Sequence, residues 1–161
     1  MDQTKKQRIL KNYLKNFYVK PGRVVKEKLK GHEHKNLVIL GSKPRLLEAG
    51  NVILLARGRK EYKYVNVHEF VEMYLGQVEE ESTMFNFPQS LLLISYGFGE
   101  PPNVQLDNFM SAVLARRLDQ FHQSVVLSTT KDAIKKMNPQ VVTQFGRIDI
   151  TGETTKETEN F

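Results

Sequence analysis

One turn of the chain carries residue types that could hold a phosphate group. The segment Gly41-Ser42-Lys43-Pro44-Arg45 follows a continuous apolar run and precedes a helical pattern. A phosphate-binding loop occupies such a place, because its backbone amides wrap the phosphates and its lysine neutralises them. The complete pattern, G-x-x-x-x-G-K-[ST], is absent here, and Pro44 removes one amide donor. Gly41 and Lys43 are therefore candidates for a vestigial nucleotide site.

Three further candidates follow two other apolar runs. An ATPase site needs an acidic residue at the end of the strand 91–94, because carboxylate oxygens bind Mg²⁺. Ser95 and Tyr96 stand there instead, and Glu100 lies four residues beyond Tyr96. Thr129 ends another apolar run and could sense a ligand or help to cap the next helix. Ser95, Glu100 and Thr129 complete the candidate site, from which we expect no ATP hydrolysis and no cofactor requirement.

These turns can meet only if the segments between them form a parallel sheet. Apolar runs typical of strands cover residues 37–40, 62–67, 91–94, 125–129 and 147–150. Helical periodicity covers residues 45–56, 68–77, 104–121 and 132–137. This alternation predicts a three-layer α/β fold around a mostly parallel sheet. In such sheets ligands bind beyond the carboxyl ends of the strands, which is where the candidate turns lie.

The N-terminal part of the chain is strongly basic. Residues 1–63 contain 17 Lys and Arg against 5 Asp and Glu, a net charge of +12, whereas the remainder carries −6. Such asymmetry is typical of proteins that bind a polyanion, with nucleic acid as the leading candidate. The alternative is a solvated basic helix without a partner.

We interpret residues 1–35 as a basic helical arm, with helical patterns over 5–17 and 23–30. Lysine and arginine neutralise phosphates and release counterions, whereas the spacing of Tyr13 and Phe17 favours packing over base stacking. The candidate nucleic-acid-binding residues are the cations of this arm up to residue 30: Lys5, Lys6, Arg8, Lys11, Lys15, Lys20, Arg23, Lys26, Lys28 and Lys30.

Length and composition limit the other possibilities. A chain of 161 residues, 40% of them hydrophobic, can bury one core, which we assign to residues 36–151, followed by a flexible polar tail at 152–161. No cysteine is present, so disulfides and thiolate metal sites are excluded, and the four histidines show no metal-binding spacing. No apolar run approaches the roughly 20 residues that span a bilayer, and no secretory signal is evident, so we expect a cytoplasmic protein without membrane contact.

The segment 91–101, LLLISYGFGEP, resembles the Walker B region of bacterial helicase loaders of the DnaC/DnaI type and of the related IstB ATPases. The similarity continues to residues 125–130, which resemble the sensor strand of that family. The resemblance covers roughly residues 36–150 and implies an AAA+ core that contacts a replicative helicase and single-stranded DNA. This chain departs from the family at the two acidic residues after the strand and at the Thr-Ser-Asn ending of the sensor strand.

Two adjacent arginines, Arg116 and Arg117, fall on a helix where family members often carry an arginine. The resemblance makes them candidates for contact with a neighbouring subunit or a DNA phosphate. The alternative is a local ion pair with Asp119 or another acidic residue.

Together these features predict a non-catalytic, loader-like protein of DNA replication or of mobile-element DNA transactions. Its expected partners are DNA, with single strands favoured, and a protein such as a replicative helicase or an intact loader ATPase. Association with further copies of the same chain is a third expectation. Two alternatives remain at this point. One is a nucleotide-dependent ATPase with an atypical phosphate loop using Lys43 and Glu100, and the other is an adaptor that binds only protein.

Overall fold

A five-stranded sheet forms the middle layer of the molecule, which the computed structural model describes over residues 19–66, 89–96 and 104–150. The strand order is β2-β3-β4-β1-β5, and every neighbouring pair is parallel. The strands are β1 (Leu37–Leu40), β2 (Tyr62–Asn66), β3 (Leu91–Ser95), β4 (Gln123–Ser128) and β5 (Gly146–Asp149). The predicted α/β fold with a parallel sheet is therefore confirmed.

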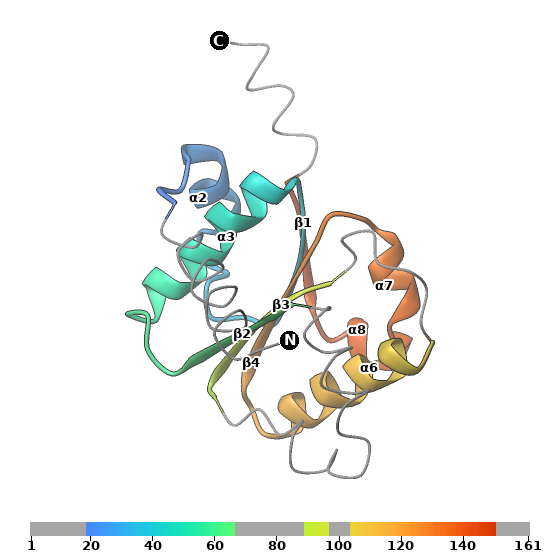
Figure 1. Ribbon diagram of the computed structural model, residues 1–161. Helices are drawn as coiled ribbons and strands as arrows, with labels where there is room; N and C mark the ends of the chain where they lie inside the picture. Colours follow the sequence, from blue (N-terminus) through green and yellow to red (C-terminus); the bar gives the residue numbers. More distant parts are fainter. Residues whose placement is uncertain (1–18, 67–88, 97–103, 151–161) are drawn as a thin grey trace, which may run out of the picture.

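Helices cover both faces of this sheet (Figure 1). One face carries α2 (Arg23–Leu29) and α3 (Lys43–Ala56). The other carries α6 (Val104–Asp119), α7 (Asp132–Lys136) and α8 (Pro139–Val142). Within the described ranges, no helix combines the length and apolarity needed to cross a bilayer.

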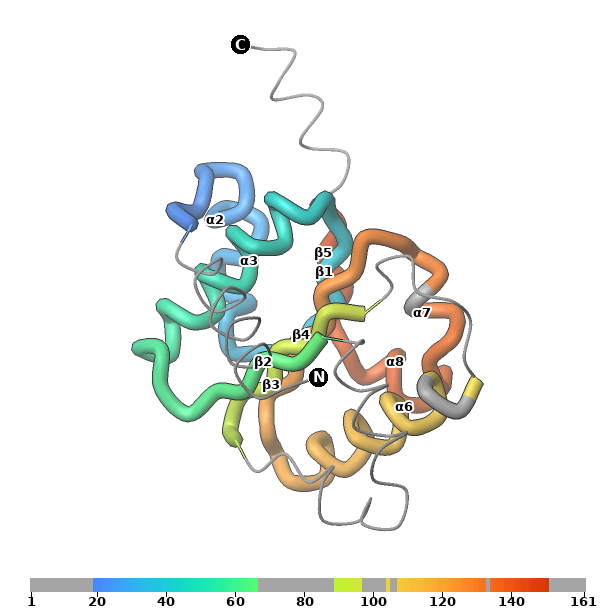
Figure 2. The backbone as a smooth tube through the Cα atoms, viewed as in Figure 1, coloured from blue at the N-terminus to red at the C-terminus, as the bar shows by residue number. Residues whose placement is uncertain are grey.

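The central strands are buried on both faces, which explains their continuous apolar sequences. In β1, Leu37 and Ile39 pack with the α2–α3 layer, whereas Val38 and Leu40 pack with the layer containing α6. Successive side chains of a strand point to opposite faces, so one short run supplies both halves of the core. Figure 2 shows β1 beside β5 in the traced chain.

The predicted element boundaries are confirmed to within a few residues, with two differences. Helix α3 begins at Lys43 rather than Arg45, because Ser42 serves as its N-cap and Pro44 is tolerated in the first turn. Helix α8 was not predicted, since four residues are too few for a periodic pattern. The predicted helices at 5–17 and 68–77, the turn after Tyr96 and the tail at 152–161 lie outside the described residues.

Helices α3 and α6 both end in a left-handed residue, but the two residues differ. After α3 this residue is Gly58, with φ +64°, and glycine adopts that conformation without steric cost. After α6 it is Phe121, with φ +59°. A side chain at such a position costs about 1–2 kcal/mol, and Phe121 is also 95% exposed.

Candidate functional site

The fold brings most of the predicted nucleotide-site residues to one edge of the sheet. Strands β3, β4 and β1 are parallel neighbours, so the turns that follow them lie side by side. The Gly41 amide donates to the Ser128 carbonyl at 3.1 Å, which ties the turn after β1 to the end of β4. The predicted residues at this edge are Gly41, Lys43, Ser95 and Thr129. Glu100 lies outside the described residues.

The turn after β1 is short. Only Gly41 and Ser42 separate the end of β1 from the first residue of α3. The Ser42 hydroxyl accepts a hydrogen bond from the Arg45 amide at 3.5 Å, and Pro44 has no amide hydrogen. Since a phosphate-binding loop works through several backbone amides aimed at the ligand, this turn offers few donors for that purpose.

A buried side chain fills the space beside the same turn. Ile150, which follows β5, is fully buried, and its amide donates to the Leu40 carbonyl at 2.8 Å. A Cβ atom added at Gly41 would lie 2.7 Å from Ile150 Cγ1. Gly41 is therefore required for close packing with Ile150, which is a structural reason for glycine at this position.

The residues at the carboxyl end of β3, Ser95 and Tyr96, are buried in the protein. Ser95 is 7% exposed, and its hydroxyl lies 2.7 Å from the Tyr64 hydroxyl, so either oxygen can donate. Tyr96 is buried and donates a hydrogen bond to the Asp107 carboxylate of α6. Burial raises the pKa of Asp107, and the charge of Lys136 acts in the opposite direction. These residues hold β3 to its neighbours, and the position at which the family has an acidic residue carries a buried hydroxyl.

The turn after β4 contains two threonines with different surroundings. The Thr130 hydroxyl accepts a hydrogen bond from the Asp132 amide at 3.1 Å, at the start of α7. The same turn is closed by the Ser128 hydroxyl, which donates to the Thr130 carbonyl at 2.9 Å. Thr129 is half-buried at the sheet edge. Thr130 thus stabilises the turn before α7, whose N-cap is Lys131 without a side-chain cap hydrogen bond, whereas Thr129 stays a candidate for contact with a ligand.

The two arginines of α6 have opposite environments. Arg116 is exposed, as a surface contact requires. Arg117 is 1% exposed, so its expected role in contacting a partner is wrong. Its guanidinium donates to the carbonyls of Gln89 and Gln123 and to the Ser124 hydroxyl, at 2.8, 2.6 and 2.8 Å.

Burial, together with the nearby charge of Arg57, lowers the pKa of Arg117 to about 10. Arg117 thus joins the end of α6 to the amino ends of β3 and β4, and Arg116 alone continues as the interface candidate.

The described cations of the basic arm lie on the surface. Lys20, Arg23, Lys26, Lys28 and Lys30 are all exposed, and Arg23 pairs with Glu27 at 3.0 Å. Helix α2 is anchored to α3 through two fully buried side chains, Val25 and Leu29. The remaining arm candidates are Lys5, Lys6, Arg8, Lys11 and Lys15, which lie outside the described residues.

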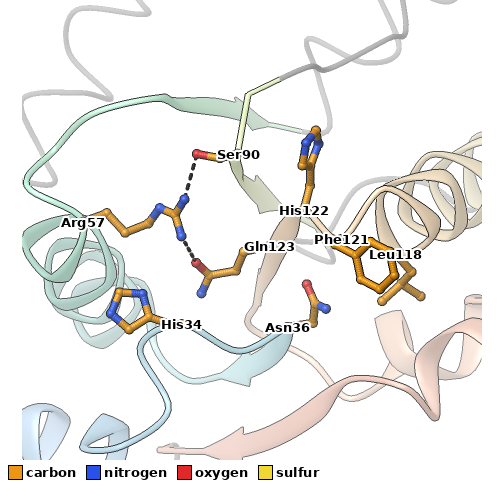
Figure 3. A pocket seen from close by; sticks show the side chains of 8 residues that line it. All are labelled: His34, Asn36, Arg57, Ser90, Leu118, Phe121, His122 and Gln123. Carbon is orange, nitrogen blue, oxygen red and sulfur yellow. Dashed lines mark hydrogen bonds between the residues drawn. The ribbon is translucent and has the colours of Figure 1, made fainter.

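A pocket that the sequence did not indicate lies at the opposite edge of the sheet, where β1, β3 and β4 begin (Figure 3). Its volume is about 400 Å³. Arg57 points toward two polar side chains, donating to the Gln123 side-chain oxygen at 2.9 Å and to the Ser90 hydroxyl at 2.7 Å. His34, Asn36, Phe121 and His122 complete the polar and aromatic lining. No local pattern marks this pocket, because its residues come from four separate segments.

The chain is similar to known proteins in fold but not in sequence. No protein-family model matches the chain, and no curated protein matches its sequence. Solved structures do match. The DnaC helicase loader aligns with a TM-score of 0.54 and 14% identity, over 79% of this chain and 86% of the loader. The AMPPCP-bound DnaA from Aquifex aeolicus aligns with a TM-score of 0.52 and 18% identity, over 79% of this chain and 44% of that protein.

The core of this chain therefore has a fold similar to that of the DnaC helicase loader and of DnaA. A replication initiator DnaA bound to AMPPCP and single-stranded DNA has the same fold, with a TM-score of 0.50 and 17% identity over 84% of this chain. This chain spans about half the length of that DnaA structure. The AAA+-like core expected from residues 91–101 and 125–130 is therefore confirmed as a fold.

Proposed function

We propose that the protein is a non-catalytic, loader-like component of DNA replication or of mobile-element DNA transactions. It would hold a protein partner, such as a replicative helicase or an intact loader ATPase, and would bind DNA through its basic arm. The observation that carries the non-catalytic part is the two-residue turn between β1 and α3 in a fold shared with DnaC and DnaA. That turn lacks the length and the amides with which a nucleotide-binding loop surrounds phosphate.

The second support is electrostatic. All five described nucleic-acid-binding candidates of the arm are exposed, while α2 itself is fixed to α3 by Val25 and Leu29. Charges on an anchored helix lose less conformational freedom on binding than charges on a free segment. Phosphate neutralisation by such residues supplies most sequence-independent affinity for nucleic acid.

Charge reversal in the arm tests the DNA contact. We expect replacement of Lys11, Lys15, Lys26 and Lys28 by glutamate to abolish binding of a fluorescently labelled single-stranded oligonucleotide at modest salt, measured by anisotropy. Four lost phosphate contacts would also flatten the dependence of affinity on salt concentration, by about 0.7 in logarithmic slope per contact.

A matched control reverses four exposed cations elsewhere, Lys131, Lys135, Lys136 and Arg147. The control variant has the same net charge as the arm variant, so it isolates position from total charge. Retained binding in the arm variant, or equal loss in both variants, would contradict a specific role for the arm. A wild-type protein that binds no oligonucleotide would favour the protein-only adaptor.

Nucleotide binding provides the test of the alternative, which is favoured by the AMPPCP-bound DnaA structures with the same fold. We expect calorimetric titration with Mg-ATP to give no micromolar binding, because the turn at Gly41 presents few amide donors. Micromolar affinity that disappears in Lys43→Ala but persists in Lys35→Ala would instead establish a nucleotide-dependent protein with an atypical phosphate loop.

A further inference from the structure

The pocket at the amino ends of β1, β3 and β4 combines a fixed cation, Arg57, with an exposed aromatic ring, that of Phe121. Arg57 is held in place because its partner Gln123 is itself fixed: the Gln123 side-chain nitrogen donates to the carbonyls of Glu33 and Lys35, at 2.7 and 2.9 Å. The Gln123 side-chain oxygen is thereby turned toward Arg57. The guanidinium is preorganised before any ligand arrives.

The charge of Arg57 has no carboxylate in direct contact within the described part of the chain. Its hydrogen-bond partners there are neutral, and the Glu61 carboxylate connects to it only through the Ser90 hydroxyl, at 3.3 Å. The residues lining the pocket include two histidines and no acidic side chain. The buried guanidinium of Arg117 is a second cation near the pocket, and it lies close enough to Arg57 that the charge of Arg57 lowers the pKa of Arg117. A pocket with this balance of charge favours an anionic ligand.

The aromatic ring at the rim belongs to Phe121, whose backbone conformation is unfavourable for a residue with a side chain. The end of α6 is a Schellman motif: the His122 amide donates to the Arg117 carbonyl at 2.9 Å, and the Phe121 amide donates to the Leu118 carbonyl at 3.1 Å. Glycine is the favoured residue at the left-handed position of this motif, which Phe121 occupies.

Helix α3 ends in the same motif with the favoured residue. There the Arg59 amide donates to the Leu54 carbonyl at 2.8 Å, and Gly58 takes the left-handed position of the motif, although Arg59 after it is left-handed too, with φ +57°. Phe121 therefore introduces backbone strain and exposes almost all of its ring, and neither effect stabilises the fold. Strain of this kind, at the rim of a pocket, points to a ligand that uses the ring.

We infer that this pocket binds an unpaired nucleotide of single-stranded nucleic acid, with the base stacked on Phe121 and its phosphate drawn toward Arg57. Base–aromatic stacking tolerates all four bases, and a cationic groove beside the ring attracts the backbone. The Asn36 side-chain nitrogen is a donor of the kind that hydrogen-bonds base edges, while the Asn36 side-chain oxygen accepts from the Ser124 amide at 2.7 Å. The inference rests on the proposed function for the identity of the polymer, and it adds a second contact that the basic arm does not supply.

The decisive variant is Phe121→Gly, because it removes the ring and relieves the backbone. We expect affinity for a labelled oligothymidylate to fall about tenfold, within the range that loss of one stacked base produces. The midpoint of urea unfolding should stay the same or rise, since glycine is preferred at this position. The logarithmic salt slope should not change, because no phosphate contact is removed. Phe121→Tyr should retain the affinity.

The control is Val104→Ala, which truncates another exposed apolar side chain at the opposite end of α6 and should leave binding intact. A photo-crosslinking oligonucleotide containing iodouracil locates the contact directly. We expect crosslinks in the tryptic peptide 118–131, which contains Phe121, and their loss in Phe121→Gly.

Three outcomes separate this inference from the proposed function. If the arm variant loses binding while Phe121→Gly binds as the wild type does and crosslinks fall only in the arm, the pocket inference is overturned and the arm assignment stands. The pocket inference is equally overturned if Phe121 is needed only for capture of a protein. If Phe121→Gly loses affinity and the arm variant does not, the pocket contact is supported and the arm assignment falls.

Discussion

Replacing Arg117 with alanine is expected to lower the free energy of unfolding by about 3 kcal/mol. Three acceptors lose their donor, namely the carbonyls of Gln89 and Gln123 and the hydroxyl of Ser124. Removal of a fully buried side chain also leaves a cavity at the junction of α6, β3 and β4. Relief from burying a charge offsets part of this loss, because burial already disfavours the protonated form of Arg117. Urea unfolding followed by circular dichroism measures the change.

The neighbouring arginine provides the control for this experiment. Arg116→Ala changes the same residue type on the same helix at an exposed position, and its effect should stay within about 0.5 kcal/mol. Arg117→Met keeps most of the side-chain volume and should recover the part of the loss that comes from the cavity. Equal stability of the two alanine variants would mean that the three hydrogen bonds of Arg117 contribute nothing to the fold.

Substitution of Gly41 by alanine is expected to cost about 2 kcal/mol, in the range of overpacking in a filled interior. The added methyl would lie 2.7 Å from Ile150 Cγ1, and Ile150 is fully buried, so neither group can move freely. The measurement is a double-mutant cycle with Ile150→Ala. That second change alone should cost about 2–5 kcal/mol through the cavity it leaves.

In the double variant, the methyl group added at position 41 enters the space that Ile150 vacates. The combined loss should therefore be smaller than the sum of the single losses by more than about 1 kcal/mol. Simple additivity would show that the two positions do not share one packed site. It would also remove the argument that Ile150 fills the space beside the turn after β1.

The fold could be predicted from sequence because its information is local. Apolar runs such as Leu37–Leu40 and Leu91–Ser95, separated by helical periodicity, require strands buried on both faces and therefore a parallel sheet. The sequence around Gly41 also indicated a turn between a strand and a helix. Local pattern could not show that Ile150 packs against Gly41, since that contact joins residues from opposite ends of the core.

The error at Arg117 has a specific physical origin. Position 117 lies three and four residues after Leu114 and Val113, which are buried, so helical geometry puts it on the same buried side of α6. The resemblance to helicase loaders suggested a surface contact instead, and the three internal acceptors that make burial tolerable come from residues 89, 123 and 124. The pocket was missed for a similar reason, because Arg57, Ser90 and Gln123 meet only after folding.

The position of β1 in the sheet has a consequence for how the chain acquires its structure during synthesis. This strand precedes the other four in the described chain, yet it lies between β4 and β5, which are the last two of the described strands to be synthesised. Its backbone donors and acceptors have no strand partner until residue 128 has emerged, and the second side of β1 waits for residue 149. Such distant pairing slows folding, because the entropy of closing a long loop must be lost before any contact compensates it. The apolar segment Leu37–Leu40 therefore has no strand partner on either side while the residues before β4 are being synthesised, and this part of the sheet closes only after β5 has emerged.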